Sequence, residues 1–134
     1  ETLDLLVALS QEACNNYYGS LKPKGVLMVD NSMVKQTPTN HFIGLPFTQM
    51  ANERIKNPLT VNTLVLGAIT YILPFARPRT IKRALENNMP PKIHEINFKA
   101  FSLGQREAKK HFGPPPDIWQ EAANHAEENE EDFD

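Results

Sequence analysis

The chain has 134 residues, of which 40% are apolar and 22% charged, a size and balance that suit a single globular domain with one core. Its one cysteine, Cys14, excludes an internal disulfide framework and predicts a reducing compartment, and residues 1–10 contain no basic signal-peptide region, so we expect a cytoplasmic protein. The net charge of −2 divides unevenly, because residues 1–110 hold all 14 lysines and arginines against 8 acids. This surplus can attract phosphates or an acidic partner, but it is too weak to predict nucleic-acid binding.

The first elements predict a strand, a helix and a second strand. Residues 3–9 are a nearly continuous apolar run, which is typical of a strand covered on both faces in a parallel sheet. Ser10 is placed to cap a helix over residues 11–18, and a turn over residues 21–25 leads into a second buried strand, residues 26–29. Strand, helix and strand within about 30 residues predict a βαβ unit.

A loop and a third strand are predicted next. Residues 33–40 are polar and show no period, so they are expected to form a loop. Residues 41–45 are short and apolar and predict a strand, after which Thr48 is placed to cap a helix that ends near residue 55.

Residues 58–73 predict a buried central helix. Asn57 suits the N-cap, Pro58 suits the first helical position, and Pro74 helps to end the helix. At about 16 residues the helix is shorter than the roughly 20 that a membrane span needs, so no span is expected. Its surface carries small residues at helical spacing, namely Thr60, Thr63, Gly67 and Thr70. Either Gly67 permits close packing in the core, or part of this small-residue stripe (Thr63, Gly67 and Thr70) meets another subunit.

Two further helices and a tail complete the chain. Residues 77–80 open a helix with Ile81, Ala84 and Leu85 on one face, stopped by residues 87–90, and another helix runs from Pro91 to about Lys110. The Pro-rich residues 113–116 form a predicted hinge, followed by a short helix over residues 118–126. Residues 127–134 contain six acids and are expected to be disordered. We therefore predict a domain over residues 1–112 and a hinge with an acidic tail over residues 113–134.

The order of elements predicts the α/β class, with an open, Rossmann-like parallel sheet flanked by helices on both sides and a helical C-terminal half. Three strands make a thin sheet, because sheets average about 5 to 6 strands. We therefore expect the sheet to be incomplete on its N-terminal side, with further strands from residues before Glu1 or from another chain.

Polar side chains follow the predicted strands at their carboxyl ends, where open parallel sheets bind ligands. Candidate cofactor-binding residues are Ser10, Asn31, Ser32 and Thr48, with Gln11 and Asp30 beside them. Hydroxyls and amides without an adjacent histidine or cysteine favour binding over nucleophilic catalysis, so no catalytic residue is predicted. The alternative is structural: Ser10 and Thr48 are N-caps, and Asn31 and Ser32 form a turn.

A cluster of basic residues marks a predicted helix start. A helix N-terminus with added guanidinium groups suits a phosphate or an acidic partner, and solvated surface charge is the alternative. The cluster consists of Arg77, Arg79, Lys82 and Arg83. The four histidines are scattered without metal-ligand spacing, so no metal site is predicted, and Cys14 is expected to pack rather than react.

Five segments in register resemble one enzyme family. They are Leu-Asp-Leu-Leu-Val-Ala-Leu with Gln-Glu-Ala (3–13), Leu-Lys-Pro with Gly25 (21–25), Gly-Leu-Pro-Phe-Thr with Ala-Asn-Glu (44–53), Asn-Pro with Asn62 and Leu-Gly-Ala (57–68), and Asn-Phe-Lys-Ala-Phe with Gly104 (97–104). Over about residues 3–110 the chain resembles the gamma subunit, or gamma domain, of the 2-oxoacid:ferredoxin (acceptor) oxidoreductases. It is similar to the second part of that domain, since the leading strand and GxGGQG-type turn of the family are absent from this sequence.

The resemblance implies a role within a multi-subunit complex. Such complexes oxidatively decarboxylate a 2-oxoacid to an acyl-coenzyme A and pass electrons to ferredoxin or another acceptor. The family carries thiamine diphosphate mainly on its beta and alpha subunits and iron-sulfur clusters on others. The gamma domain is implied to act in assembly with alpha, beta and delta subunits and to contact coenzyme A. The resemblance implies no cofactor bound by this chain alone.

Two other classes remain open. Leu-Lys-Pro-Lys-Gly before an apolar strand also occurs in S-adenosylmethionine-dependent methyltransferases, where antiparallel strands normally follow. A stand-alone interaction module that uses the small-residue stripe and the acidic tail is the other alternative.

Overall fold

The computed structural model describes residues 2–73 and 75–114. The chain divides into two compact units, residues 1–58 and 59–134. The predicted helix over residues 118–126 and the predicted disorder of residues 127–134 lie outside the described residues. Among the residues that are described, no helix has the length and apolar character to cross a membrane.

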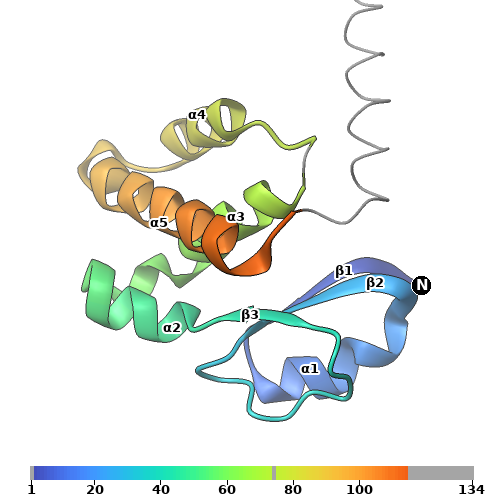
Figure 1. The fold of residues 1–134 in the computed structure, drawn as a ribbon. Helices are drawn as coiled ribbons and strands as arrows, with labels where there is room; N and C mark the ends of the chain where they lie inside the picture. The colour runs from blue at the N-terminus through green and yellow to red at the C-terminus, as the bar shows by residue number, and fades with distance from the viewer. Residues whose placement is uncertain (1, 74, 115–134) are drawn as a thin grey trace, which may run out of the picture. The chain divides into compact units, whose positions relative to one another are not determined.

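The first unit contains the parallel sheet (Figure 1). Its elements are β1 (Leu3–Ala8), α1 (Gln11–Tyr17), a 3-10 turn (Tyr18–Ser20), β2 (Leu21–Asp30), β3 (Ile43–Leu45), α2 (Phe47–Met50) and a π-helical turn (Ala51–Ile55). The strand order is β1-β2-β3 and both pairings are parallel, which confirms the predicted sheet of three parallel strands. Ser10 is the N-cap of α1, as predicted, because its hydroxyl accepts a hydrogen bond from the Ala13 amide at 3.1 Å.

The start of β2 was predicted wrongly as a turn over residues 21–25. In the structure Leu21 already pairs with Leu3, and the next pair is Leu5 with Val26, so β2 carries extra residues between the two pairs. Pro23 lies in this irregular stretch, where the absence of its amide hydrogen costs no ladder bond. The turn-forming residues therefore bulge the strand without ending it.

A small hydrophobic cluster holds α1 against the sheet. It is made of Leu6, Ala8, Cys14, Leu27, Val29 and Val34. Cys14 is fully buried in it, and burial raises the pKa of its thiol, which keeps the thiol protonated. Both observations agree with the packing role predicted for this cysteine.

The helix after β3 starts at a different residue from the one predicted, but it ends near residue 55 as predicted. Its N-cap is Pro46, so Thr48 lies inside the first turn and the predicted Thr48 N-cap is wrong. Its last turn is π-helical, and Lys56 ends it in the left-handed region with φ 63°, where the Lys56 amide donates to the Ala51 carbonyl. Non-glycine residues seldom adopt this region, but a left-handed residue is a common way for a helix to end.

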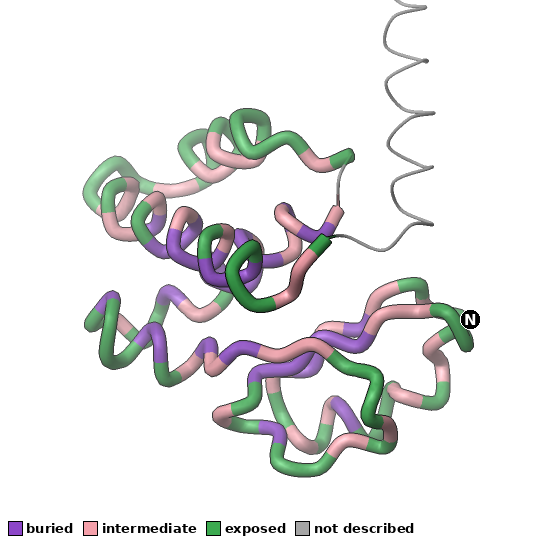
Figure 2. The backbone as a smooth tube through the Cα atoms, in the orientation of Figure 1, coloured by how far each residue is buried: buried purple, intermediate pink, exposed green. Residues whose placement is uncertain are grey.

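The second unit is a helical assembly. After a 3-10 turn (Pro58–Thr60) it contains α3 (Val61–Ile72), α4 (Pro78–Asn88), a second 3-10 turn (Pro91–Ile93) and α5 (His94–Phe112). The central helix is buried and ends near Leu73, as predicted. It begins later than predicted, because Pro58–Thr60 forms a 3-10 turn and Thr60, in place of Asn57, is the N-cap of α3. Figure 2 shows buried residues along α3 and α5 and none along α4.

Two glycines bring α3 and α5 into close contact. A Cβ atom on Gly67 would lie 2.1 Å from the Phe101 carbonyl oxygen, and a Cβ on Gly104 would lie 2.0 Å from the Leu64 carbonyl oxygen. No real Cβ approaches an oxygen so closely, so the helices cross backbone to backbone only because both positions lack a side chain. The prediction that Gly67 permits close packing is confirmed.

Candidate functional site

The carboxyl end of β2 carries a buried carboxylate with four hydrogen-bond donors. Asp30 is 0% exposed. Its Oδ1 accepts from the Ser32 amide at 3.1 Å and the Ser32 hydroxyl at 2.5 Å, while Oδ2 accepts from the Thr48 amide at 3.0 Å and the Thr48 hydroxyl at 2.5 Å. A buried charge is tolerated when it is saturated in this way, because each bond replaces lost hydration.

The sheet register explains why these groups meet. Asp30 pairs with Leu45 at the end of β3, and α2 begins two residues later at Phe47. The first amides of a helix lack intrahelical partners, and the Asp30 carboxylate supplies an acceptor from the neighbouring strand. One side chain therefore ties the turn after β2 to the start of α2.

The structure brings together two of the four candidate cofactor residues. Ser32 and Thr48 meet on Asp30, whereas Ser10 is occupied as the α1 N-cap. Asn31 begins the turn after β2 and its amide donates to the Leu45 carbonyl at 3.1 Å. The turn prediction for Asn31 and Ser32 is confirmed. Since each Asp30 oxygen already accepts two bonds, the arrangement positions backbone rather than activating a nucleophile.

Asp30 is the residue that the sequence prediction undervalued. It was placed beside the candidates at the strand end, but the four-bond role depends on a partner 18 residues away in Thr48. The available signal was a lone acid between a buried strand and a turn serine, since an acid there needs donors.

A second polar contact holds the loop after β2 beside α1. Gln11 Oε1 accepts from the amides of Lys35 at 2.9 Å and Gln36 at 3.0 Å, and Gln11 Nε2 donates to the Gln36 carbonyl at 2.7 Å. A hollow of about 350 Å³ lies next to this contact, lined by Asn15, Tyr18, Gly19, Gln36, Thr37 and Pro38. None of its lining residues is buried, so the hollow is open to solvent.

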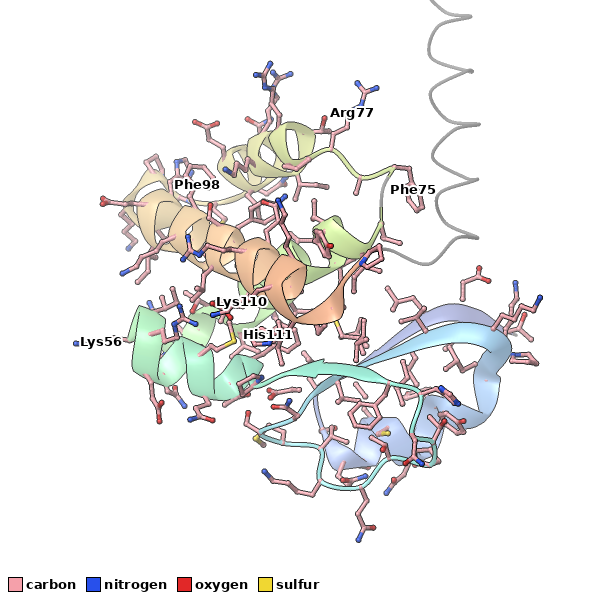
Figure 3. All side chains as sticks on the ribbon, viewed as in Figure 1. Lys56, Phe75, Arg77, Phe98, Lys110 and His111 are labelled. Carbon is pink, nitrogen blue, oxygen red and sulfur yellow. The ribbon has the colours of Figure 1, made fainter. Side chains whose placement is uncertain are left out.

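Three residues of the basic cluster, Arg79, Lys82 and Arg83, lie on α4. A shallow hollow of about 400 Å³ is lined by Pro78, Arg79, Lys82, Arg83 and Glu86. Arg77 is the N-cap residue, and Figure 3 shows its side chain projecting outward at the start of the helix. The structure therefore places three of the four predicted residues around one hollow, with Arg77 just before it.

The α4 helix makes few packing contacts with the rest of its unit. No residue of α4 is buried, and Lys82 lies with its ammonium nitrogen 5.8 Å from the centre of the Phe101 ring of α5. A cation at that distance from an aromatic face is attracted to it, which holds the lysine stem while its charge stays near solvent. The surface offers several cationic donors to an anion or an acidic partner.

The small-residue stripe is covered by the chain itself at two of its positions. The Thr63 hydroxyl donates to Asn97 Oδ1 at 2.7 Å, and Gly67 lies against the Phe101 backbone, so α5 occupies this face. Thr70 is buried and donates to the Leu66 carbonyl within its own helix at 2.7 Å. Contact of Thr63, Gly67 and Thr70 with another subunit stays a prediction.

Comparison with known proteins decides the family. The sequence pattern described as pyruvate ferredoxin/flavodoxin oxidoreductase matches residues 1–107. The chain belongs to the pyruvate ferredoxin/flavodoxin oxidoreductase family. The family resemblance predicted from the sequence is confirmed, and the predicted boundary at residue 112 stays a prediction.

Relatives in the pyruvate ferredoxin/flavodoxin oxidoreductase family include named subunits. The chain is 33% identical over 111 residues to the 2-oxoglutarate synthase subunit KorC of Methanocaldococcus jannaschii, covering 80% of this chain and 59% of that protein. It thus spans less than two thirds of the length of this relative.

Solved structures show the same fold. The gamma subunit of a keto/oxoacid ferredoxin oxidoreductase from Geobacter sulfurreducens aligns with a TM-score of 0.76 and 29% identity, covering 80% of this chain and 64% of that one. A 2-oxoglutarate:ferredoxin oxidoreductase from Magnetococcus marinus aligns with a TM-score of 0.73 and 22% identity, covering 87% of this chain and 21% of that one. The second likeness concerns the fold alone.

The residues of this chain do not match two cofactors that the family implies. The sequence has one cysteine, and the described residues contain no group of three or more metal-ligand side chains. Iron-sulfur clusters are held mostly by four cysteine thiolates, so these residues do not fit one. The sequence also lacks a glycine-rich phosphate loop, so it does not fit a complete thiamine diphosphate site.

Proposed function

We propose that this chain is a gamma-type part of a 2-oxoacid:ferredoxin oxidoreductase complex. The observation that carries the proposal is the family match over residues 1–107, together with the fold shared with the Geobacter gamma subunit. In the reaction proposed for the complex, the bond between the carboxyl and keto carbons of the 2-oxoacid breaks and carbon dioxide leaves. The acyl group passes to the sulfur of coenzyme A, whose thiol loses its proton to solvent, and two electrons pass to ferredoxin or another acceptor.

Within the complex, the proposed role of this chain is assembly and anion contact. Its polar groups at the sheet edge are engaged in positioning backbone, as the four bonds to Asp30 show, and they form no nucleophile with a base. Thiamine diphosphate and iron-sulfur clusters are assigned to partner subunits of alpha, beta or delta type. The α4 surface of Arg77, Arg79, Lys82 and Arg83 is where we expect an acidic subunit or the phosphates of coenzyme A to bind.

The proposed substrate and the proposed compartment each rest on one observation. The relative from Methanocaldococcus is named a 2-oxoglutarate synthase subunit, so 2-oxoglutarate is the first 2-oxoacid to test. A reducing, cytoplasmic location agrees with the single buried thiol of Cys14.

The methyltransferase alternative has lost its support. It rested on Leu-Lys-Pro-Lys-Gly before an apolar strand, and in that fold antiparallel strands normally follow. Within the described residues β2 is followed instead by one short parallel strand and by helices. The stand-alone interaction module is separated from the proposal by the test below.

The test is purification of the native complex through a tag on this chain, followed by an assay. We expect thiamine-bearing and iron-sulfur subunits to co-purify, and the complex to release carbon dioxide from 2-oxoglutarate or another 2-oxoacid when coenzyme A and ferredoxin are present. The isolated chain should oxidise no 2-oxoacid, because it has no electron sink of its own. Recovery of the chain without such subunits would support a stand-alone module, and oxidation by the isolated chain would disprove the assignment.

A further inference from the structure

The α4 surface has an excess of cations with few partners in the described part of the chain. Residues 77–86 contain four basic side chains and one acid, Glu86. Arg79 and Arg83 have no ion pair or hydrogen bond of their side chains within residues 2–73 and 75–114, and they line the same hollow of about 400 Å³ with Lys82. Like charges at helical spacing repel one another, so this surface gains most from a partner with several anionic groups.

The same chain contains a segment of complementary charge. Residues 127–134 hold six acids and no basic residue, and no lysine or arginine follows Lys110. The family match ends at residue 107, so this acidic segment lies outside the matched region. Carboxylates are the groups that guanidinium donors bind in paired geometry.

The connecting chain is long enough for the two to meet. The α5 helix contacts α4 through Lys82 and Phe101, and Phe112 at its end lies about 17 Å further along the helix axis. Residues 114–127 can span up to about 45 Å when extended. The distance to be bridged is therefore shorter than the reach, and a tether of this length gives an effective concentration of the order of millimolar.

We propose that the acidic segment 127–134 binds the α4 surface of Arg79, Lys82 and Arg83 in the same molecule. The segment acts as an internal substitute for an anionic partner, so the partner must displace it before it can bind. The contact itself depends only on charge and reach, whereas its role in regulating complex assembly rests on the proposed function. The bond is salt-dependent, because the screening length falls from about 10 Å at about 0.1 M to about 3 Å at about 1 M.

The experiment compares amide spectra of the full 134-residue chain with a tail-neutral variant. The variant carries Glu127→Gln, Glu128→Gln, Glu130→Gln, Glu131→Gln, Asp132→Asn and Asp134→Asn. At low salt we expect the amide resonances of residues 78–86 to differ between the two chains, and the difference to vanish at about 1 M salt. Unchanged resonances in β1, β2 and α3 confirm that the variant is folded.

A second measurement uses a synthetic peptide of residues 115–134 as the probe. It should bind the tail-neutral chain at least tenfold more tightly than the unaltered chain, whose own tail occupies the surface. Introducing Arg79→Ala with Arg83→Ala into the tail-neutral chain should abolish this binding, and Lys109→Ala with Lys110→Ala on α5 should leave it unchanged. Identical α4 resonances in both chains, or equal peptide affinity, would overturn the proposal. Neither result bears on whether the chain assembles with oxidoreductase subunits. The binding of the acidic segment can therefore be disproved without disproving the proposed function, and the reverse also holds.

Discussion

At the scale of single residues, Asp30 joins two parts of the first unit that are distant in sequence. Its carboxylate is fully buried and receives the amides and hydroxyls of Ser32 and Thr48. An asparagine of the same shape has one acceptor oxygen and one donor nitrogen. Two of the four donors would then face a nitrogen that cannot accept, and the charge assistance would be lost.

We therefore expect Asp30→Asn to lower the free energy of unfolding by about 2–4 kcal/mol, the range for an unsatisfied buried group combined with lost bonds to a charge. Urea unfolding of the 134-residue chain followed by circular dichroism measures the change. The matched control is Asp4→Asn, since Asp4 is 68% exposed and pairs at the surface with Lys22, and its loss should cost under about 1 kcal/mol. Equal effects of the two substitutions would show that the buried network contributes no more than a surface pair.

Gly67 stabilises the contact between α3 and α5 because it has no side chain. Alanine would be favoured by about 1 kcal/mol at an ordinary mid-helix site. Here its Cβ would meet the Phe101 carbonyl oxygen at 2.1 Å and the Gln105 amide nitrogen at 2.9 Å, both of them backbone atoms that cannot rotate away. The free-energy cost of this clash should exceed the gain from alanine's higher helix propensity.

We expect Gly67→Ala to destabilise the chain by about 1–3 kcal/mol net, and Gly67→Leu to do so more strongly and to weaken complex assembly on gel filtration. Gly19→Ala is the control, because a Cβ at Gly19 meets nothing within 4 Å and should change the melting temperature little. A Gly67→Ala chain with an unchanged or raised melting temperature would mean that α3 and α5 can separate at no cost.

At the scale of elements, α3 and α4 differ in how far their side chains are buried. The α3 helix has seven buried residues and is held by backbone contact with α5, whereas α4 has none and presents its charges outward. A helix that gains little from its own core is free to serve as a binding surface, since its side chains are not needed for packing.

The docking role of α4 is tested by changing Arg77, Arg79, Lys82 and Arg83 to alanine together in the assembled complex. If α4 binds an acidic subunit, this chain should be lost from the complex, most completely at high salt; if it binds coenzyme A, the complex stays intact and KM for coenzyme A rises. The control removes four exposed charges from α5 by Lys99→Ala, Arg106→Ala, Lys109→Ala and Lys110→Ala. No difference between the two quadruple variants in either readout would leave the α4 charges as solvated surface.

At the scale of the whole molecule, two compact units share one chain. The first unit holds the sheet and its buried carboxylate, and the second holds the crossing of α3 and α5 and the basic surface. A fold by itself implies no chemistry, so the proposed function rests on family membership and on surfaces suited to partners. Under the proposed function, the reaction belongs to the complex and this chain contributes contacts to it.

The sequence by itself determined the elements whose cause is local. Short, nearly continuous apolar runs predicted three parallel strands, Ser10 predicted a helix start by its own cap, and the mid-helix glycine at Gly67 predicted close approach of a backbone. Each of these is decided within a few residues, because caps, periodicity and the lack of a Cβ act over one or two helical turns or a strand.

Only the tertiary structure decided what depends on partners far along the chain. Thr48 was expected to cap its own helix, but Asp30, 18 residues earlier, supplies the acceptor, because the register of β2 and β3 brings the two together. Likewise, residues 21–25 have turn composition yet continue β2, since pairing of Leu21 with Leu3 outweighs the local preference. Which backbone fills the space at Gly67 was open in the sequence, and α5 of the same chain fills it, because Gly104 allows the reciprocal approach.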